Sequence, residues 1–557
     1  MLLVPATAGT SRLQGYPMST SFNGTISRSA ADRLDALVAT AAVPSGPGLA
    51  VAVLHQGELI YKRAVGLANL AYEIPLTDRS VMRIASQSKQ FTVMMILMLE
   101  AEGRLSLDDD IRSYFPWLPD WEHRVTIGHL ASNTSGIRDI LDAMIMAGMP
   151  ITAPSSRAAA RAIVARQRKL NFAPSTDVLY SNSNFLLLSE LIEDVTGKSF
   201  GEALKHYITE PLGMTDTRLM ARDDEIYPRL ADHHRRGAKG EWLKSAWGIA
   251  IGGEGGLVST LSDMIAWQRN LRAPKVGTVE MVERMGRPFV TIDGIASPYG
   301  LGLVRTMHRG LQLIGHGGWI AGSRSEAFRV PSEDLAFIVL SNHDDFSSFA
   351  IARDMLDIVL EKERADLISP EGVAALKTCY GFWRSHEDGL VFRLEDAGGL
   401  PALAGSMGVS PLEEVGRGEF RARGALPPFS FTIAPDGEIV TKKFDRRRRY
   451  SRIDAAASVD VDVTGVYESN EAGLSATVER QAGTLRMRVS SQFGAAAVEL
   501  EACDRDLFLA HPADRDLHDA WRLAPWVLPW LYTVLFTTEG LVLNSDRGRE
   551  VKLAKRS

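Results

Sequence analysis

The chain has 557 residues and a net charge of −6, from 62 Lys and Arg against 68 Asp and Glu. Hydrophobic residues make up 45% and charged residues 23%, which is typical of a globular protein and excludes a disordered, collagen-like or disulfide-scaffold chain. The mildly acidic balance argues against nucleic acid as a main partner, because phosphate binding needs a concentrated basic face, and the length predicts more than one domain.

The N-terminal segment has no basic region leading into an apolar stretch, so we expect no secretory signal. The apolar runs are too short for a transmembrane helix, and we predict a cytoplasmic protein that does not bind membranes. Residues 1–25 are interpreted as a disordered leader, with Met18 as an alternative start. Two cysteines, Cys379 and Cys503, are too few for a thiol framework, so we expect two buried thiols, a single disulfide being the alternative.

Residues 26–368 alternate between strand-like and helix-like segments. Hairpin-like strands lie near both ends with helices between them, which predicts an α+β domain whose terminal segments share one antiparallel sheet flanked by helices. The expected segments are a hairpin over 48–62, helices over 84–102, 184–196 and 347–363, and strands over 313–318, 324–330 and 335–341.

After residue 370 the pattern changes to short strands separated by Gly, Pro and Asp turns, which is typical of β-barrels or sandwiches. Residues 381–390 (GFWRSHEDGL) align with residues 465–474 (GVYESNEAGL) at an offset of 84 residues. The repeat predicts two similar all-β domains, over 369–455 and 456–557, with chance similarity as the alternative.

Other charged segments are assigned to structure rather than to a site. The basic run at 442–449 is expected to be a solvated strand edge or to pair with an acidic patch of another domain, since it lacks the interleaved aromatics of a nucleic-acid surface. The pair His233–His234 is expected in a solvated loop rather than as metal ligands. No metal-binding or nucleotide-binding motif is found, so we expect no metal and no cofactor.

Ser86 and Lys89 form the first candidate motif, Ser-x-x-Lys, at the start of an apolar helix. At this spacing both side chains lie on one helix face, and the backbone N–H of a serine at a helix N-terminus is available to an oxyanion. A lysine one turn away can activate the hydroxyl group. On its own the motif is weak, because an N-cap serine beside a surface lysine has the same pattern.

Two further motifs follow along the chain. Tyr180-Ser-Asn182 precedes a helix and places a phenol and an amide at a loop tip, where the phenol can transfer a proton if cationic neighbours lower its pKa. In His316-Gly-Gly318-Trp319 the glycines allow a ligand backbone to approach a strand, and the Trp319 N–H is a second candidate oxyanion donor. Each motif alone has an ordinary structural interpretation.

In this order, 94 and 136 residues apart, the three motifs resemble those of the serine β-lactamase and penicillin-binding-protein superfamily, in its class C-like branch. Tyr-Ser-Asn stands where related enzymes have Ser-Asp-Asn, and His-Gly-Gly where they have Lys-Thr-Gly. Supporting segments are 132–139, with Asn133 at the usual His, and 253–257, 262–267 and 299–302. The two β-domains and Asn133 resemble the D-aminopeptidase subgroup, which carries two C-terminal antiparallel β-barrels.

The resemblance implies roles for the motif residues. Ser86 is then the acylated nucleophile, Lys89 and Tyr180 activate it and relay its proton, and Asn182, His316, Gly318 and Trp319 bind the substrate, with the N–H groups of Ser86 and Trp319 on the oxyanion. In the D-aminopeptidases a loop of the last domain helps to bind the substrate amine. The corresponding candidates here are Asp514, Asp516 and Asp519, with a solvated surface loop as the alternative.

The sequence therefore predicts a serine hydrolase that forms an acyl-enzyme and releases N-terminal D-amino acids from small peptides, amides or esters. A carboxylesterase, a β-lactamase or a D,D-carboxypeptidase of the same superfamily is the alternative. A non-catalytic binding protein with this fold is a third hypothesis, disfavoured because all three motifs are intact. A homodimer is expected as the commonest oligomer.

Overall fold

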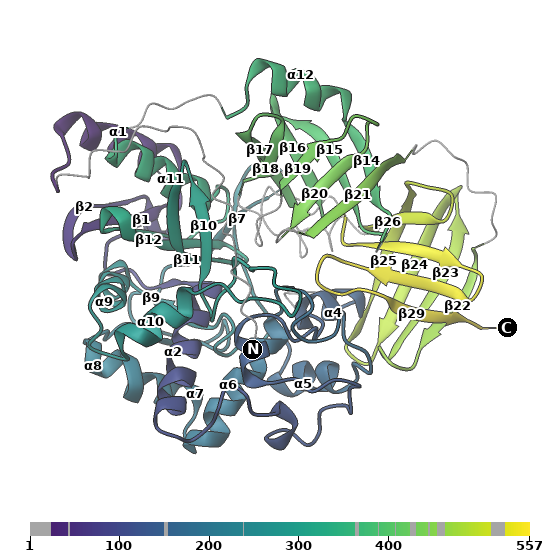
Figure 1. Cartoon of the computed structure of the whole chain (residues 1–557), viewed down its shortest axis with the longest axis horizontal. Coiled ribbons are helices and arrows are strands. Elements are labelled where there is room, and N and C mark those ends of the chain that lie inside the picture. The colour runs from purple at the N-terminus through teal and green to yellow at the C-terminus, as the bar shows by residue number, and fades with distance from the viewer. Residues whose placement is uncertain are drawn as a thin grey trace, which may run out of the picture.

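The computed structural model describes residues 24–42, 45–149, 154–237, 239–361, 367–387, 389–406, 408–423, 430–443, 446–453, 463–513 and 530–556. These residues form an α+β domain followed by two closed antiparallel β-barrels, which confirms the predicted fold class (Figure 1). The predicted leader, except for residues 24 and 25, lies outside the described residues.

The first domain contains a six-stranded antiparallel sheet in the order β10-β11-β12-β13-β1-β2. The N-terminal hairpin pairs with the last strand, with Leu49 opposite Ser341, so that the two ends of the domain share one sheet as predicted. The strands are β1 (Leu49–His55), β2 (Glu58–Val65), β10 (Val304–His308), β11 (Leu311–Ile320), β12 (Ser323–Val330) and β13 (Leu335–Ser341).

Both faces of the sheet are covered by helices, and the alternation of side chains along β1 reflects this. Leu49, Val51 and Val53 pack in a cluster with α1 (Arg28–Thr40) and α11 (Ser348–Val359). The intervening Ala50, Ala52 and Leu54 belong to the larger cluster on the other face. That cluster includes α2 (Ser88–Ala101), α6 (Asn182–Thr196) and α9 (Leu261–Arg272).

The remaining elements of this domain are short and lie mostly around the larger cluster. They are β3 (Leu67–Asn69), β4 (Ile74–Pro75), β5 (Met82–Arg83), η1 (Ala85–Gln87), η2 (Ile111–Ser113), α3 (Ile127–Ala131), α4 (Ile140–Met146), α5 (Arg157–Ala165), α7 (Phe200–Leu204), η3 (Lys205–Thr209), α8 (Glu210–Leu212), β6 (Arg218–Leu219), β7 (His234–Arg236), β8 (Trp242–Lys244), β9 (Leu257–Ser259), α10 (Val279–Gly286) and η4 (Pro331–Glu333). The helix α12 (Pro370–Thr378) leads into the first barrel.

Each barrel is a closed ring of eight antiparallel strands. Both copies of the internal repeat form a first strand, which opens at Gly381 and at Gly465 with φ of 134° and 140°. The first barrel consists of β14 (Gly381–Ser385), β15 (Val391–Ala397), β16 (Leu400–Gly405), β17 (Gly408–Gly416), β18 (Glu419–Ala422), β19 (Ser430–Ile433), β20 (Ile439–Lys443) and β21 (Arg446–Ile453). The second consists of β22 (Gly465–Ser469), β23 (Leu474–Gln481), β24 (Thr484–Ser491), β25 (Gly494–Ala502), β26 (Leu507–Pro512), β27 (Tyr532–Thr537), β28 (Gly540–Asn544) and β29 (Val551–Lys555).

Two smaller expectations have different outcomes. Arg448 of the basic run pairs with Asp177 of the first domain at 3.4 Å, as the predicted contact with another domain requires. The expectation of a solvated loop at His233–His234 is wrong, because both side chains are buried. Nε2 of His233 accepts the backbone N–H of Arg83 at 3.2 Å, and His234 starts β7.

Cys379 and Cys503 are both free and buried, in two separate apolar clusters. Within the described part of the chain, none of the helices combines the length and the hydropathy needed to span a bilayer.

Candidate active site

Ser86 lies on a tight turn that opens α2. The preceding residue, Ala85, has φ of 48°, a left-handed conformation that costs a non-glycine residue roughly 1 kcal/mol. The hydroxyl of Ser88 supports this turn, since it donates to the carbonyl of Ala85 at 2.6 Å and accepts the N–H of Leu257 at 3.1 Å. As a result Ser86 stays half-exposed between neighbours that are fully buried.

Lys89 lies on the first turn of α2 with its ammonium nitrogen at the serine. Nζ is 3.1 Å from Oγ of Ser86, 2.8 Å from Oδ1 of Asn182 and 2.5 Å from the carbonyl oxygen of Glu254. Burial lowers the pKa of Lys89 to about 7, against the opposing charges of Glu254 and Asp139. Near neutral pH a large fraction of this amine is therefore uncharged and able to accept the serine proton.

Tyr180 completes a triangle with these two residues. Its phenol hydrogen-bonds with Ser86, and Nζ of Lys89 lies 4.7 Å from the centre of its ring. Burial raises the pKa of Tyr180 well above its ordinary value, and the cationic neighbours do not reverse this shift. The lowered pKa that a proton-transferring phenol would need is therefore not found. In the structure Tyr180 is a neutral phenol, which makes Lys89 the stronger candidate for the base.

Asn182 is held in one orientation by a buried carboxylate. Oδ2 of Asp139 accepts both the backbone N–H of Asn182 at 2.6 Å and its side-chain Nδ2 at 2.8 Å. Because Nδ2 is the donor to Asp139, Oδ1 is the atom that faces Lys89. The amide thus has one end fixed to the protein and the other on the ammonium group.

Asn133 joins the segment 132–136 to the Tyr-Ser-Asn motif. Its φ is 58°, and its Oδ1 accepts the N–H of Ser181 at 3.1 Å and Nδ2 of Asn184 at 2.9 Å. Its carbonyl accepts the N–H of Leu179 at 3.0 Å. These bonds fix the chain on both sides of Tyr180.

His316, on β11, faces the cluster of Ser86, Lys89 and Tyr180, with its ring 6.1 Å from that of Tyr180. Nδ1 lies 2.5 Å from the carbonyl of Gly317, which identifies it as the protonated nitrogen, so Nε2 accepts from the hydroxyl of Tyr299 at 3.1 Å. Burial, with a smaller contribution from Lys89, lowers the pKa of His316 to about 3. His316 is therefore neutral and offers this site hydrogen bonds rather than a positive charge.

The glycines of the third motif let β11 approach residues 84–86, the serine segment. A Cβ atom on Gly318 would lie 2.2 Å from the carbonyl oxygen of Ile84, two residues before Ser86. A Cβ on Gly317 would lie 2.5 Å from the carboxylate of Glu326. The close approach that the glycines permit is thus, in the first place, to the chain itself.

The register of β11 turns the N–H of Trp319 toward an open edge. Ile320 and Ser323 flank the two-residue turn to β12 and so form a hydrogen-bonded pair. The two kinds of pair alternate along an antiparallel ladder, so the next residues, Trp319 and Arg324, are opposite each other without backbone hydrogen bonds between them. The Trp319 N–H therefore points to the other edge of β11, where pairing with β10 ends at Gly315. This is the geometry that a second oxyanion donor requires.

A residue of the second barrel also belongs to this site. Arg547, in the turn between β28 and β29, lies 2.5 Å from Oδ1 of Asp142 and 3.5 Å from Oδ1 of Asp139. Its positive charge lowers the pKa of Lys89, as a secondary effect after burial. The acidic residues predicted to reach the cleft, Asp514, Asp516 and Asp519, lie outside the described residues.

Comparison with known proteins identifies the family. Residues 34–362 match the sequence model of the family described as Beta-lactamase. The chain belongs to the beta-lactamase family. As a serine hydrolase of this family it is 32% identical to a D-aminopeptidase of Gluconobacter oxydans over 88% of this chain and 94% of that relative. It is 31% identical to a D-aminopeptidase of Brucella anthropi over 76% of this chain and 79% of that relative.

Among solved structures, this beta-lactamase-family chain is similar to the octameric penicillin-binding protein homologue from Pyrococcus abyssi. The TM-score is 0.55, at 22% identity, over 76% of this chain and 99% of the other. At that identity the similarity supports the fold alone.

The sequence motifs did not identify four residues that contact this centre, namely Asp139, Glu254, Tyr299 and Arg547. Asp139, Glu254 and Tyr299 lie in segments that resemble the family, and their positions in these segments are the only signal. Arg547 has none, because its role depends on how the second barrel packs against the hydrolase domain.

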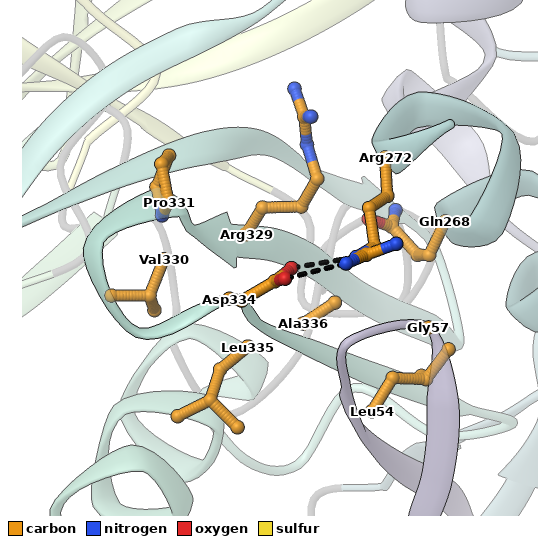
Figure 2. Close-up of a pocket in the computed structure, with 10 residues that line it drawn as sticks. All are labelled: Leu54, Gly57, Gln268, Arg272, Arg329, Val330, Pro331, Asp334, Leu335 and Ala336. Carbon is orange, nitrogen blue, oxygen red and sulfur yellow. Dashed lines mark hydrogen bonds and ion pairs between the residues drawn. The ribbon is translucent and has the colours of Figure 1, made fainter. Parts of the chain in front are cut away.

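A pocket of about 370 Å³ in the hydrolase domain contains none of the motif residues. Figure 2 shows it between the β1–β2 turn at Gly57, the C-terminal part of α9 and the β12–β13 connection. Arg272 and Asp334 form a bidentate ion pair in its wall, at 2.8 and 2.7 Å. The candidate catalytic centre is instead the cluster around Ser86.

Proposed function

We propose that this protein is a D-stereospecific aminopeptidase that releases N-terminal D-amino acids from small peptides, amides or esters through an acyl-enzyme. The observation that carries the proposal is the similarity to a protein named D-aminopeptidase over 88% of the chain, which includes the barrels as well as the hydrolase domain. The arrangement of Ser86, Lys89 and Tyr180 supports covalent catalysis by a serine.

The reaction follows from the geometry. Neutral Lys89 accepts the proton of Ser86 as Oγ forms a bond to the substrate carbonyl carbon, and the N–H groups of Ser86 and Trp319 hold the oxyanion. When the intermediate collapses, the C–N or C–O bond breaks and the proton passes from Lys89, with Tyr180 in hydrogen-bond contact, to the leaving group. Water then attacks the acyl-enzyme while Lys89 accepts its proton. The bond between the acyl carbon and Oγ breaks, Lys89 gives the proton to Oγ, and the free acid leaves with Ser86 restored.

The remaining motif residues bind and orient the substrate in this proposal. Asn182, fixed by Asp139, offers its amide to the acyl group, while His316 and Gly318 border the edge of β11 along which the substrate lies. One or more of Asp514, Asp516 and Asp519 pairs with the substrate ammonium, a charge-assisted contact worth about 1.5–3 kcal/mol.

A substrate panel tests this function. We expect turnover of D-alanine p-nitroanilide, much slower turnover of the L isomer, and no turnover of nitrocefin. Ser86→Ala should lower kcat by roughly 10⁴-fold or more, because it removes the nucleophile. Turnover of a p-nitrophenyl ester alone would refute the aminopeptidase assignment, and a Ser86→Ala variant with near-normal activity would refute the serine mechanism.

A carboxylesterase is the second candidate, because the same acyl-enzyme chemistry hydrolyses esters. A β-lactamase or D,D-carboxypeptidase is less well supported, since these substrates carry a carboxylate and His316 is neutral where related enzymes have lysine in the third motif. The cytoplasmic location and the homodimer stay predictions. Light scattering on the purified chain tests the dimer.

A further inference from the structure

The turn between β28 and β29 carries a buried cation into the wall of the candidate catalytic centre. The chain at Arg547 is bonded to the hydrolase domain through its backbone as well. Its carbonyl accepts Nδ2 of Asn171 at 3.1 Å and the N–H of Asp139 at 3.3 Å. The hydroxyl of Ser545 donates to Asp142 at 2.6 Å. These contacts fix the turn against α4, beside which the second barrel lies in Figure 1.

From Arg547 a continuous series of polar contacts leads to the serine. Its guanidinium pairs with Asp139, whose Oδ2 accepts both N–H donors of Asn182. Asn182 in turn accepts from Lys89, and Lys89 contacts Ser86. Four contacts therefore connect the second barrel to the nucleophile.

The pair of carboxylates explains why an arginine is needed here. Asp139 and Asp142 are both buried, and an unpaired buried carboxylate is strongly unfavourable. Arg547 contacts both, and their charges raise its pKa above the ordinary value. Without this cation the two carboxylates would lose the partner that holds Asp139 in position to accept both bonds from Asn182.

We propose that Arg547 and Asp139 are positioning residues for catalysis, so that the second barrel is part of the catalytic apparatus. Arg547 holds Asp139 in place, Asp139 fixes the amide of Asn182, and Asn182 holds the nitrogen of Lys89 at Ser86. The proposal rests on the roles proposed above for Ser86 and Lys89, but not on the identity of the substrate.

The charges around Lys89 make the proposal testable, because each predicts the direction in which the pKa of Lys89 should change. Glu254, in the segment before β9, and Asp139, at the start of α4, favour the protonated amine, while Arg547 of the second barrel disfavours it. Tyr180 and His316 also face the amine, and both are uncharged at neutral pH. Removal of Arg547 should therefore raise the pKa of Lys89, and removal of the Asp139 charge should lower it.

The experiment measures the rate at which a fluorophosphonate probe labels Ser86, as a function of pH, in the full-length protein. Wild-type labelling should rise with pH as Lys89 loses its proton. In Arg547→Gln the midpoint should move to higher pH and the rate at pH 7 should fall at least tenfold. In Asp139→Asn the midpoint should move to lower pH, with a lower plateau because Asn182 loses its carboxylate anchor. Arg547→Lys, which keeps the charge, should keep the wild-type midpoint.

Glu471→Gln is the matched control. Glu471 pairs with Arg138 across the same domain contact at 2.8 Å but has no bond to the polar series. The labelling profile of Glu471→Gln should match that of the wild type. Equal profiles in Arg547→Gln and wild type, or shifts of the same sign in Arg547→Gln and Asp139→Asn, would overturn the proposal. If Arg547→Gln does not fold, Asp139→Asn and Arg547→Lys decide it.

Failure of the proposed function gives a different result. A protein that reacts with the probe as expected but hydrolyses no D-aminoacyl substrate would refute the aminopeptidase assignment and leave the positioning proposal standing. A wild-type protein whose Ser86 is not labelled would refute both.

Discussion

Lys89 is surrounded by protein on all sides, and its burial has a direct chemical consequence. A lysine in water has its amine protonated at neutral pH, whereas burial lowers the pKa of Lys89 to about 7. Only the neutral amine can accept the proton of Ser86. In the mechanism that we propose, the pKa of this one side chain determines the pH range in which Ser86 is acylated.

The pKa of Lys89 predicts that the acylation rate falls as the pH is lowered. Below pH 7 the protonated fraction of Lys89 grows, so kcat/KM should fall by about tenfold per pH unit on the acidic side, and it should level off above pH 7. Stopped-flow or steady-state rates between pH 5 and 9 measure this limb. A rate independent of pH over this range would contradict the assignment of Lys89 as the base.

Lys89 and Tyr180 should differ in the size of their effects. Because Tyr180 is a neutral phenol in hydrogen-bond contact with Ser86, Tyr180→Phe should cost about 10²-fold in kcat/KM. Lys89→Ala removes the base and should cost about 10⁴-fold. Equal losses, or a larger loss in Tyr180→Phe, would indicate that the phenolate is the base.

At the scale of single elements, β11 and the serine segment are in contact because Gly318 has no side chain. Gly318→Ala places a Cβ atom 2.2 Å from the carbonyl of Ile84 and 2.3 Å from Oγ of Ser325, so the strand must move. We expect a loss of about 1–3 kcal/mol in the free energy of unfolding and a drop in kcat of at least 10²-fold. Denaturant unfolding and steady-state kinetics measure the two effects.

Gly201→Ala is the control for that substitution. Gly201 lies in α7, and a Cβ atom there would lie 3.8 Å from Cβ of Leu219, so the substitution should be neutral or slightly stabilising. If Gly318→Ala behaved like Gly201→Ala, the close contact between β11 and the serine segment would be refuted.

The elements that the sequence predicted well are those with a strong local signal. The hairpin of β1 and β2, the apolar helix α2 and the glycine-terminated α6 each follow from periodicity and end residues. The structure adds the left-handed turn at Ala85, which no local pattern indicates. The prediction of a solvated loop at His233 and His234 was wrong, because a polar local sequence gives no information on the distant residues that pack over it.

At the scale of the whole molecule, Asp142 joins the hydrolase domain directly to the second barrel. It accepts from the hydroxyl of Ser545, from the N–H of Arg547 and from the Arg547 guanidinium. Asp142→Ala leaves these donors buried without their acceptor, so we expect a loss of about 3–5 kcal/mol in the free energy of unfolding. In calorimetry the wild type should unfold in one transition and this variant at a clearly lower temperature.

Asp224→Ala serves as the comparison, since Asp224 is exposed and, among the described residues, forms its ion pair with Arg222 alone. It should leave the transition temperature unchanged. A transition in Asp142→Ala at the wild-type temperature would show that the contact contributes no stability.

The number of domains could be predicted from sequence, but not their assembly. A repeat of ten residues was enough to indicate two similar β-domains, because each copy forms the first strand of a barrel. The motifs likewise placed Ser86, Lys89, Tyr180, Asn182 and His316 in one centre. Arg547 could not be found in this way, since a lone arginine in a turn gains its role only from the surface against which the barrel packs.

The position of Arg547 along the chain has a consequence for biosynthesis. The ribosome adds 230 residues between His316 and Arg547. At bacterial or eukaryotic speeds this takes roughly 10 to 50 s, during which the hydrolase domain emerges and folds with all three of its motifs. The cation that pairs with Asp139 arrives only after that interval. A nascent hydrolase would thus remain weakly active while it is still attached to the ribosome, and full activity would begin when the last barrel closes on it.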